Sequence, residues 1–180
     1  MESLRGQLLI AGASLVDPNF RRTVVLVGEH NEDGALGVVL NRPAPVPVRE
    51  VVPPLGSLVA EDEQIFIGGP VQPQGAVVLA EFQEPDQASL LVFGSIGFLL
   101  GDVEHDDLAG LRRARVFAGY AGWGPGQLEQ EMKESSWIAE PALPDDVFAP
   151  RPAQLWSDVL RRKGSSYRLL SLMPEDPSLN

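Results

Sequence analysis

Glu29 and His30 stand side by side at the end of an apolar segment, and they are the residues of this chain best suited to proton transfer. A histidine next to a carboxylate can act as a general acid or base near neutral pH. The alternative interpretation is structural: the histidine makes an orienting hydrogen bond that holds the following loop. We favour the structural interpretation and assign no catalytic residue.

Asn41 and Arg42 follow the next apolar segment. If the two segments close into a hairpin in register, this amide and this guanidinium lie near the same sheet edge as Glu29 and His30. Arg42 could then hold a carboxylate or a phosphate, or it could pair with Glu29. The four residues together would form the site of a small-molecule enzyme, for which the sequence indicates no substrate.

The stretch GYAGWGPGQLEQEM, residues 119–132, places four glycines between an expected strand and an expected helix. Backbone N–H groups at a helix start can cradle a phosphate. The glycine spacing matches neither GxGxxG nor GxxxxGK[ST], however, and Glu129 and Glu131 would repel an anion. We favour a packing role, in which glycine permits positive φ or close approach. The candidates kept for a ligand or partner site are Gly119, Gly122, Trp123, Gly126 and Gln127.

Three tryptophans, Trp123, Trp137 and Trp156, are most simply core or groove aromatics. If Trp123 is exposed on the glycine-rich turn, it is a natural anchor for a protein partner, because tryptophan is enriched among the residues that dominate binding energy.

Other catalytic signatures are absent. FGSIG, residues 93–97, resembles a nucleophile elbow but has Phe93 where glycine is required. The chain has no cysteine, which excludes disulfides, thiolate metal sites and thiol catalysis. His30 and His105 each have neighbouring carboxylates that could reach a hard cation, but acidic turns are far commoner than cation sites. We therefore assign no metal and no cofactor.

Composition indicates one ordinary globular domain. The chain has 180 residues, of which 44% are hydrophobic and 22% charged. No apolar run approaches the roughly 20 residues that span a bilayer, and the first residues lack the features of an export signal. We expect a cytoplasmic protein with no membrane association.

The formal net charge of −11 opposes direct binding to nucleic acid, because lysine and arginine supply the affinity for phosphates. Clusters such as Arg21-Arg22 are more simply explained as solvated surface. A regulator that binds DNA directly is therefore a disfavoured alternative.

Short, β-branched segments predict a largely antiparallel sheet, with Asp33-Gly34 in a hairpin turn and the two hairpin strands covered on both faces. The expected strands are residues 8–11, 23–28, 35–40, 64–67, 76–82, 90–93, 116–120 and 167–172. Punctuation by proline, glycine and charge predicts helices over residues 106–113, 125–135 and 152–163. The five prolines of residues 43–54 indicate a surface connection, and the expected domain is 1–172 with a polar tail at 173–180.

The segments QLLIAGASLVDPNFRRTVVLVGEHNEDGALGVVLNRP, IFIGGPV and FAGYAGWGPGQLEQEMKESSW occur in this order, followed by Leu155-Trp156. This order strongly resembles the YqgE/AlgH family of bacterial proteins along nearly the whole chain. The resemblance implies a single compact α+β domain with a mixed, mostly antiparallel sheet flanked by helices, and it implies no agreed enzymatic activity or cofactor. Members have been labelled transcriptional regulators after a link to alginate production, which is a phenotype and not a mechanism.

The family's recurring residues map here onto Asp17, Phe20, Glu29, His30, Gly34, Gly37, Asn41, Arg42, Pro43, Gly68, Gly69, Pro70, Val71, Gly119, Gly122, Trp123, Gly126, Gln127, Leu128, Glu131 and Trp137. A cysteine-based redox role considered for some members is impossible in a chain without cysteine. Our leading hypothesis is a non-enzymatic regulatory or interaction protein that binds an unknown protein partner or a small molecule through the glycine-tryptophan turn and the nearby Glu29-His30 and Asn41-Arg42 edge.

Overall fold

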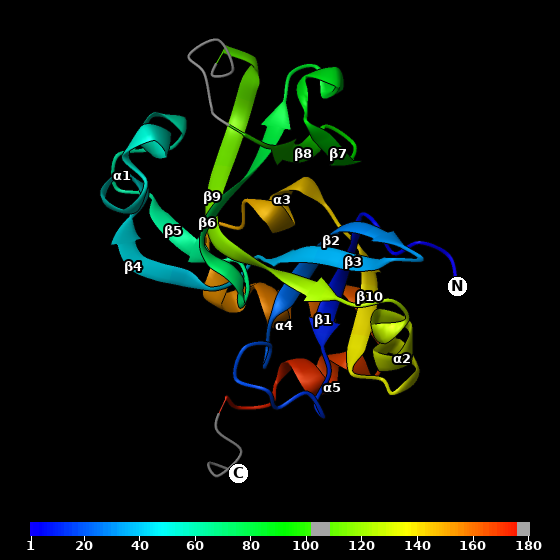
Figure 1. The fold of residues 1–180 in the computed structure, drawn as a ribbon. Coiled ribbons are helices and arrows are strands. Elements are labelled where there is room, and N and C mark those ends of the chain that lie inside the picture. The colour runs from blue at the N-terminus through cyan, green and yellow to red at the C-terminus, as the bar shows by residue number, and fades with distance from the viewer. Residues whose placement is uncertain (102–108, 176–180) are drawn as a thin grey trace.

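The computed structural model describes residues 1–101 and 109–175, and the strands within them form one ten-stranded sheet (Figure 1). The strand order is β10-β1-β2-β3-β9-β6-β8-β7, with β5 pairing β9 and β4 pairing β5. The β5–β9 pair is parallel and the other pairs are antiparallel. The expected α+β fold with a mixed, mostly antiparallel sheet is confirmed.

The strands are β1 (Gln7–Ala11), β2 (Val24–Asn31), β3 (Gly34–Val39), β4 (Pro43–Pro47), β5 (Gln64–Ile67), β6 (Val71–Phe82), β7 (Leu90–Phe93), β8 (Ile96–Leu99), β9 (Leu111–Trp123) and β10 (Trp137–Pro141). The α-helices are α1 (Val48–Val51), α2 (Gln127–Lys133), α3 (Pro144–Val147), α4 (Leu155–Lys163) and α5 (Tyr167–Ser171). Short 3₁₀ segments are η1 (Pro53–Leu58), η2 (Pro85–Gln87) and η4 (Pro152–Gln154).

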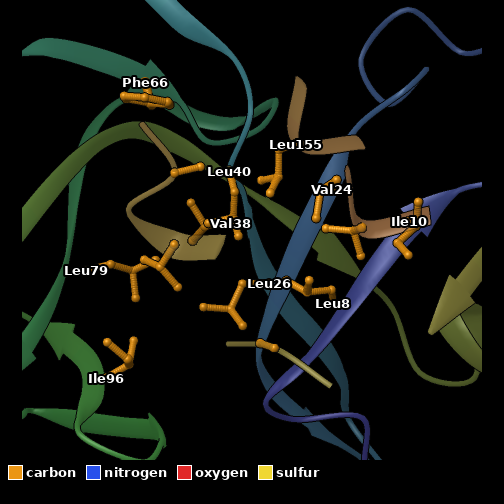
Figure 2. Packing of buried hydrophobic residues seen from close by; sticks show 14 of the residues in the cluster. Leu8, Ile10, Val24, Leu26, Val38, Leu40, Phe66, Leu79, Ile96 and Leu155 are labelled. Carbon is orange, nitrogen blue, oxygen red and sulfur yellow. The ribbon is translucent and has the colours of Figure 1, made fainter. Parts of the chain in front are cut away.

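Strands β2 and β3 are buried on both faces, as their continuous apolar character predicted, except at Leu36, which is 47% exposed. Strand β1 is buried in the same way. Successive side chains of a strand point to opposite faces, so Leu8 and Ile10 enter one core cluster while Leu9 and Ala11 enter another. The first cluster, shown in Figure 2, continues through β2 and β3 to α4. The second cluster packs against α2 and β10. Helices therefore cover both faces of this part of the sheet.

Helix α4 confirms the amphipathic pattern read from residues 152–163. Leu155, Trp156, Val159 and Leu160 are all buried in the first core cluster. The indole Nε1 of Trp156 also donates a hydrogen bond to the carbonyl of Ala11 (3.0 Å), which ties the helix to β1. This contact places Trp156 beside the loop that leads into β2.

The expectation of a surface connection over residues 43–54 is wrong for its first part, which is strand β4. The register pairs Pro43 with Phe66 and Pro47 with Gln64. Proline cannot donate a ladder hydrogen bond and is tolerated on edge strands, and β4 pairs with β5 alone. The alternating prolines therefore mark an edge strand.

The predictions for two other segments are wrong. Residues 167–171 form helix α5 and no strand, because Tyr167 and Leu170, three positions apart, both pack against the first core cluster on one helical face. Of the expected helix 106–113, residues 111–113 belong to β9, where Arg113 pairs with Glu81 of β6. Residues 106–108 lie outside the described part of the chain.

Strands β8 and β10 and helix α3 were not expected from the sequence. Within residues 1–101 and 109–175, we find no helix with the length and hydropathy needed to cross a membrane.

Candidate functional site

Four of the candidate residues, Glu29, His30, Asn41 and Arg42, lie in three separate regions of the structure. His30 lies beside α2, and Glu29 lines an apolar groove. Asn41 and Arg42 lie beyond the other end of β3, five residues from the Leu36 that pairs with Glu29. At the rise of a β-strand this separation is roughly 17 Å. The four residues proposed for a small-molecule enzyme are therefore not gathered in one site.

His30 connects the N-terminal segment to α2. Its side chain is only 3% exposed. The ring Nδ1 accepts a hydrogen bond from the backbone N–H of Leu4 (2.9 Å), so Nε2 of the neutral ring donates to Oε1 of Glu129. Adjacent strand residues face opposite sides, and the carboxylate partner of His30 is Glu129 and not Glu29. The alternative in which Glu29 and His30 act together as an acid–base pair is therefore wrong.

Acid should weaken the fold through Glu129. The hydrogen bond from His30 lowers the pKa of Glu129 below its ordinary value of 4.5, and a backbone hydrogen bond lowers it further. The unfolded chain thus binds this proton first, so the stabilisation is complete above pH 4.5 and is lost as the pH falls through the lowered pKa of the folded state.

Urea unfolding of the wild-type protein and Glu129→Gln, followed from about pH 7 down to about pH 3, would measure this contribution. We expect the wild type to be the more stable at neutral pH and the difference to shrink in acid. A difference that stays constant over this range would contradict a role for the Glu129 carboxylate.

The glycine-rich turn does not form an anion cradle. Helix α2 has seven residues and begins after Gly126, and the N–H of Gly124 donates to the side-chain Oε1 of Gln127 (2.9 Å). Glu129 adds a negative charge in the first turn of the helix. The turn is therefore closed by its own side chain, in keeping with the structural interpretation.

The interpretation of Trp123 as an exposed anchor is wrong. Its residue exposure is 7%. The indole packs against Phe20 and Trp137, with ring centroids 6.4 and 6.1 Å away, in the core cluster under α2. Successive residues of β9 face opposite sides of the sheet, so Trp123 points into this cluster and Gly122 lies on the other side.

Asn41 fixes the start of β2. Its side-chain Oδ1 accepts a hydrogen bond from the N–H of Val24 (3.0 Å), and its Nδ2 donates to the carbonyl of Arg22 (2.9 Å). Both ends of the amide are occupied by backbone groups. Asn41 therefore positions the loop that precedes β2.

Arg42 holds the same loop from its other side. Its guanidinium donates to the carbonyls of Asn19 (2.7 Å) and Arg21 (2.9 Å). The proposed pairing of Arg42 with Glu29 is wrong, since the two residues lie at opposite ends of the hairpin. Arg42 keeps further N–H groups for a ligand, because a guanidinium carries five donors.

A cleft of about 470 Å³ opens beside Arg42. It gathers three arginines, an amide and an indole: the lining residues are Pro18, Arg21, Arg22, Asn41, Arg42, Ala153, Trp156 and Glu175. We call this the arginine cleft. The loop before β2, the end of β3 and helix α4 supply its walls.

The arginines of this cleft are partly desolvated and lack close carboxylates. In the part of the chain that the structure describes, none of the three guanidiniums lies within 4.0 Å of a carboxylate oxygen. Burial lowers the pKa of Arg22 and of Arg42, and Glu175 and Asp17 oppose this effect only in part. A bound anion would compensate these charges.

Arg22 is held in an uncommon conformation. Its φ of +57° lies in the left-handed region, which costs a side-chain-bearing residue about 1–2 kcal/mol. Its guanidinium lies 4.1 Å from the centroid of the Trp156 ring and donates to the carbonyl of Met173 (2.8 Å). The Arg22 carbonyl also accepts the hydrogen bond from Asn41, and backbone conformations of this kind are found often at functional sites.

Sequence reasoning missed Arg21, Arg22 and Trp156 as site residues. It treated the two arginines as solvated surface and the indole as core. The signal that could have found the arginines is the predicted hairpin, because the start of β2 and the end of β3 meet at one sheet edge. Trp156 reaches this edge only through the packing of α4, which the hairpin does not predict.

A metal site receives no support from the described residues. Within 1–101 and 109–175, no group of three or more histidine, aspartate or glutamate side chains could hold a metal ion. The candidate cation ligands around His105 lie outside the described residues.

Relatives and solved structures share this fold along nearly its whole length. A UPF0301 protein of Streptomyces avermitilis is 44% identical, with 100% of this chain and 97% of the relative aligned. A UPF0301 protein of Mycobacterium ulcerans is 43% identical over 97% of this chain and 90% of the relative.

The crystal structure of a protein from Corynebacterium diphtheriae is similar with a TM-score of 0.86 and 30% identity, covering 96% of this chain and 94% of that one. The solution structure of the AlgH protein from Pseudomonas aeruginosa is similar with a TM-score of 0.70 and 31% identity, covering 97% and 98%. The family model described as AlgH-like matches residues 8–168. The chain therefore belongs to the AlgH-like family of UPF0301 proteins.

Proposed function

We propose that this chain is a non-enzymatic, cytoplasmic binding protein and that the arginine cleft holds a small anion bearing a phosphate or carboxylate group. The observation that carries the proposal is the meeting of Arg21, Arg22 and Arg42 in one cleft of a protein with a net charge of −11. Guanidinium groups bind such anions through paired, charge-assisted hydrogen bonds.

The cleft is preorganised for this task. Backbone carbonyls hold the guanidiniums of Arg22 and Arg42, so these side chains lose little conformational freedom when a ligand arrives. Arg21 makes no side-chain hydrogen bond among the described residues and can turn toward the ligand. Trp156, whose ring lies under the Arg22 guanidinium, adds an apolar group to the lining.

Binding without catalysis fits the residues that line the cleft. The described lining contains neither a histidine nor a serine or threonine hydroxyl, so it lacks a general base paired with a nucleophile. The enzyme alternative based on Glu29, His30, Asn41 and Arg42 would need to join regions that lie at opposite ends of the hairpin.

Calorimetric titration of the full chain with inorganic phosphate and citrate tests the proposal. We expect saturable binding that Arg21→Gln weakens by about tenfold or more, since a hydrogen bond to a charged group contributes about 1.5–3 kcal/mol. Arg112→Gln is the matched control, because Arg112 is exposed, lies outside the cleft and loses the same charge. The absence of binding, or an equal effect of both substitutions, would reject the anion site.

A transcriptional regulator that binds DNA directly makes a different prediction. Titration of mixed duplex DNA at low salt should then show affinity that falls steeply as salt is added. We expect no such binding, because the net charge of −11 opposes contact with a phosphate backbone.

A further inference from the structure

A second hollow, of about 270 Å³, lies between the β2–β3 hairpin and strands β6, β8 and β9. Its walls are almost wholly apolar. The residues that shape it are Gly28, Glu29, Leu36, Val77, Phe98 and Tyr120. We call this hollow the Glu29 groove. Among its lining residues Glu29 is the only one that carries a formal charge.

Strand alternation places the groove on the face of the sheet opposite Trp123. Ala121 and Trp123 enter the core cluster under α2, so Tyr120 and Gly122 face the other way. A Cβ built on Gly122 would lie 3.8 Å from Cε2 of Tyr120 and 4.0 Å from Cδ2 of Leu36. The Tyr120 ring and the Leu36 side chain therefore lie close together above this glycine.

Glycine also shapes the far wall of the groove. A Cβ on Gly28 would lie 2.5 Å from Cε2 of Phe98, so only glycine at this position admits the ring. Glu29 follows Gly28 and pairs with Leu36 across the hairpin, which places both on one face. The carboxylate thus stands at a wall otherwise made of aromatic and aliphatic groups.

Glu29 is a partly buried residue, and its carboxylate has neither a hydrogen-bond nor an ion-pair partner among the side chains that the structure describes. A carboxylate without a partner at the wall of an apolar groove favours a ligand of opposite charge. Apolar walls favour a hydrocarbon body, and an aromatic ring such as that of Tyr120 attracts a cation.

From this combination we propose that the Glu29 groove binds a small organic ammonium ion, with the ammonium group at Glu29 and the apolar body against Leu36, Phe98 and Tyr120. The site is distinct from the arginine cleft and selects the opposite charge. Its ligand class does not depend on the proposed function.

Titration of the full chain with hexylammonium, hexanol and hexanoate, followed by amide chemical shifts near neutral pH, tests this proposal. The three probes share a hydrocarbon body and differ in charge. We expect hexylammonium to bind saturably, hexanol to bind at least about tenfold more weakly and hexanoate not to bind, because a charge-assisted hydrogen bond contributes about 1.5–3 kcal/mol.

Three substitutions test the contributions of charge and shape to binding. Glu29→Gln keeps the size of the side chain and should weaken hexylammonium by about tenfold, whereas Glu32→Gln, in the exposed hairpin turn, should change its affinity by less than about twofold. Leu36→Lys places an ammonium group opposite Glu29 on a side chain that is 47% exposed, and it should abolish binding while the protein stays folded.

Three outcomes would overturn the proposal: no saturable binding of hexylammonium, equal binding of hexanol and hexylammonium, or unchanged binding to Glu29→Gln. The second outcome would mean that the groove binds apolar groups without recognising the charge of the ligand. Thermal unfolding of each variant shows whether a loss of binding arises from a loss of fold.

Discussion

Trp123→Ala is expected to lower the free energy of unfolding by about 3–5 kcal/mol, as truncation of a buried tryptophan does. The side chain is buried and packs edge-on against Trp137, with Phe20 and the apolar side of α2 around it. Its removal leaves a cavity that the backbone of β9 cannot close, because Ala35 of β3 pairs with residue 123. Urea unfolding followed by far-ultraviolet circular dichroism measures the loss.

Leu169→Ala supplies the matched control, since it removes an apolar side chain that is 74% exposed. We expect this control to change stability by no more than about 0.5 kcal/mol. A folded Trp123→Ala protein with unchanged stability would show instead that the indole is a surface group available to a partner.

Gly119→Ala is expected to lower the free energy of unfolding by more than about 3 kcal/mol, because two penalties coincide. The φ of Gly119 is +74°, in the left-handed region. A Cβ there would also lie 2.4 Å from the carbonyl oxygen of Gly69, a backbone atom that cannot move without disturbing the approach of β6 to β9. Thermal and urea unfolding of the variant measure the effect.

Gly126→Ala separates the two penalties. Its φ is +75°, almost the same as at Gly119, but a Cβ at this position would meet nothing within 4 Å. We expect a loss of about 1–2 kcal/mol, the conformational cost alone. Equal losses for the two variants would rule out a steric role for Gly119.

These two predictions assign much of the GYAGWGPGQ stretch to packing. Gly119 permits close approach of β6 and β9, and Trp123 fills the core under α2. The neighbouring face of the same strand, at Tyr120 and Gly122, borders the Glu29 groove. One segment thus serves the core with alternate residues, and its other residues border the Glu29 groove.

Elements with strong local signals were predictable from the sequence. The β-branched runs of β2 and β3, joined at Asp33-Gly34, formed the expected hairpin. Helix α4 showed its apolar side and its basic last turn in the sequence. Signals of this kind depend on residues a few positions apart, so they do not depend on how distant parts of the chain pack.

Weak or conflicting local signals led to errors. The segment Tyr167–Ser171 is short and apolar, which suits a strand or a helix equally, and packing against α4 decided for the helix. The start of β9 resembled a helix, but pairing with β6 extended the strand to Leu111. In both cases tertiary contacts outweighed propensity.

Motif order was enough to predict the family, and local periodicity was enough to predict the mostly antiparallel sheet, the central hairpin and α4, because both can be read along the chain. The composition of the two candidate sites, in contrast, depends on contacts between distant parts of the chain. The partner of His30 is Glu129, 99 residues away, and Trp156 meets Arg22 from a helix at the far end of the chain. Such contacts depend on the order of the strands and on how the helices pack against the sheet, and no short stretch of sequence encodes either.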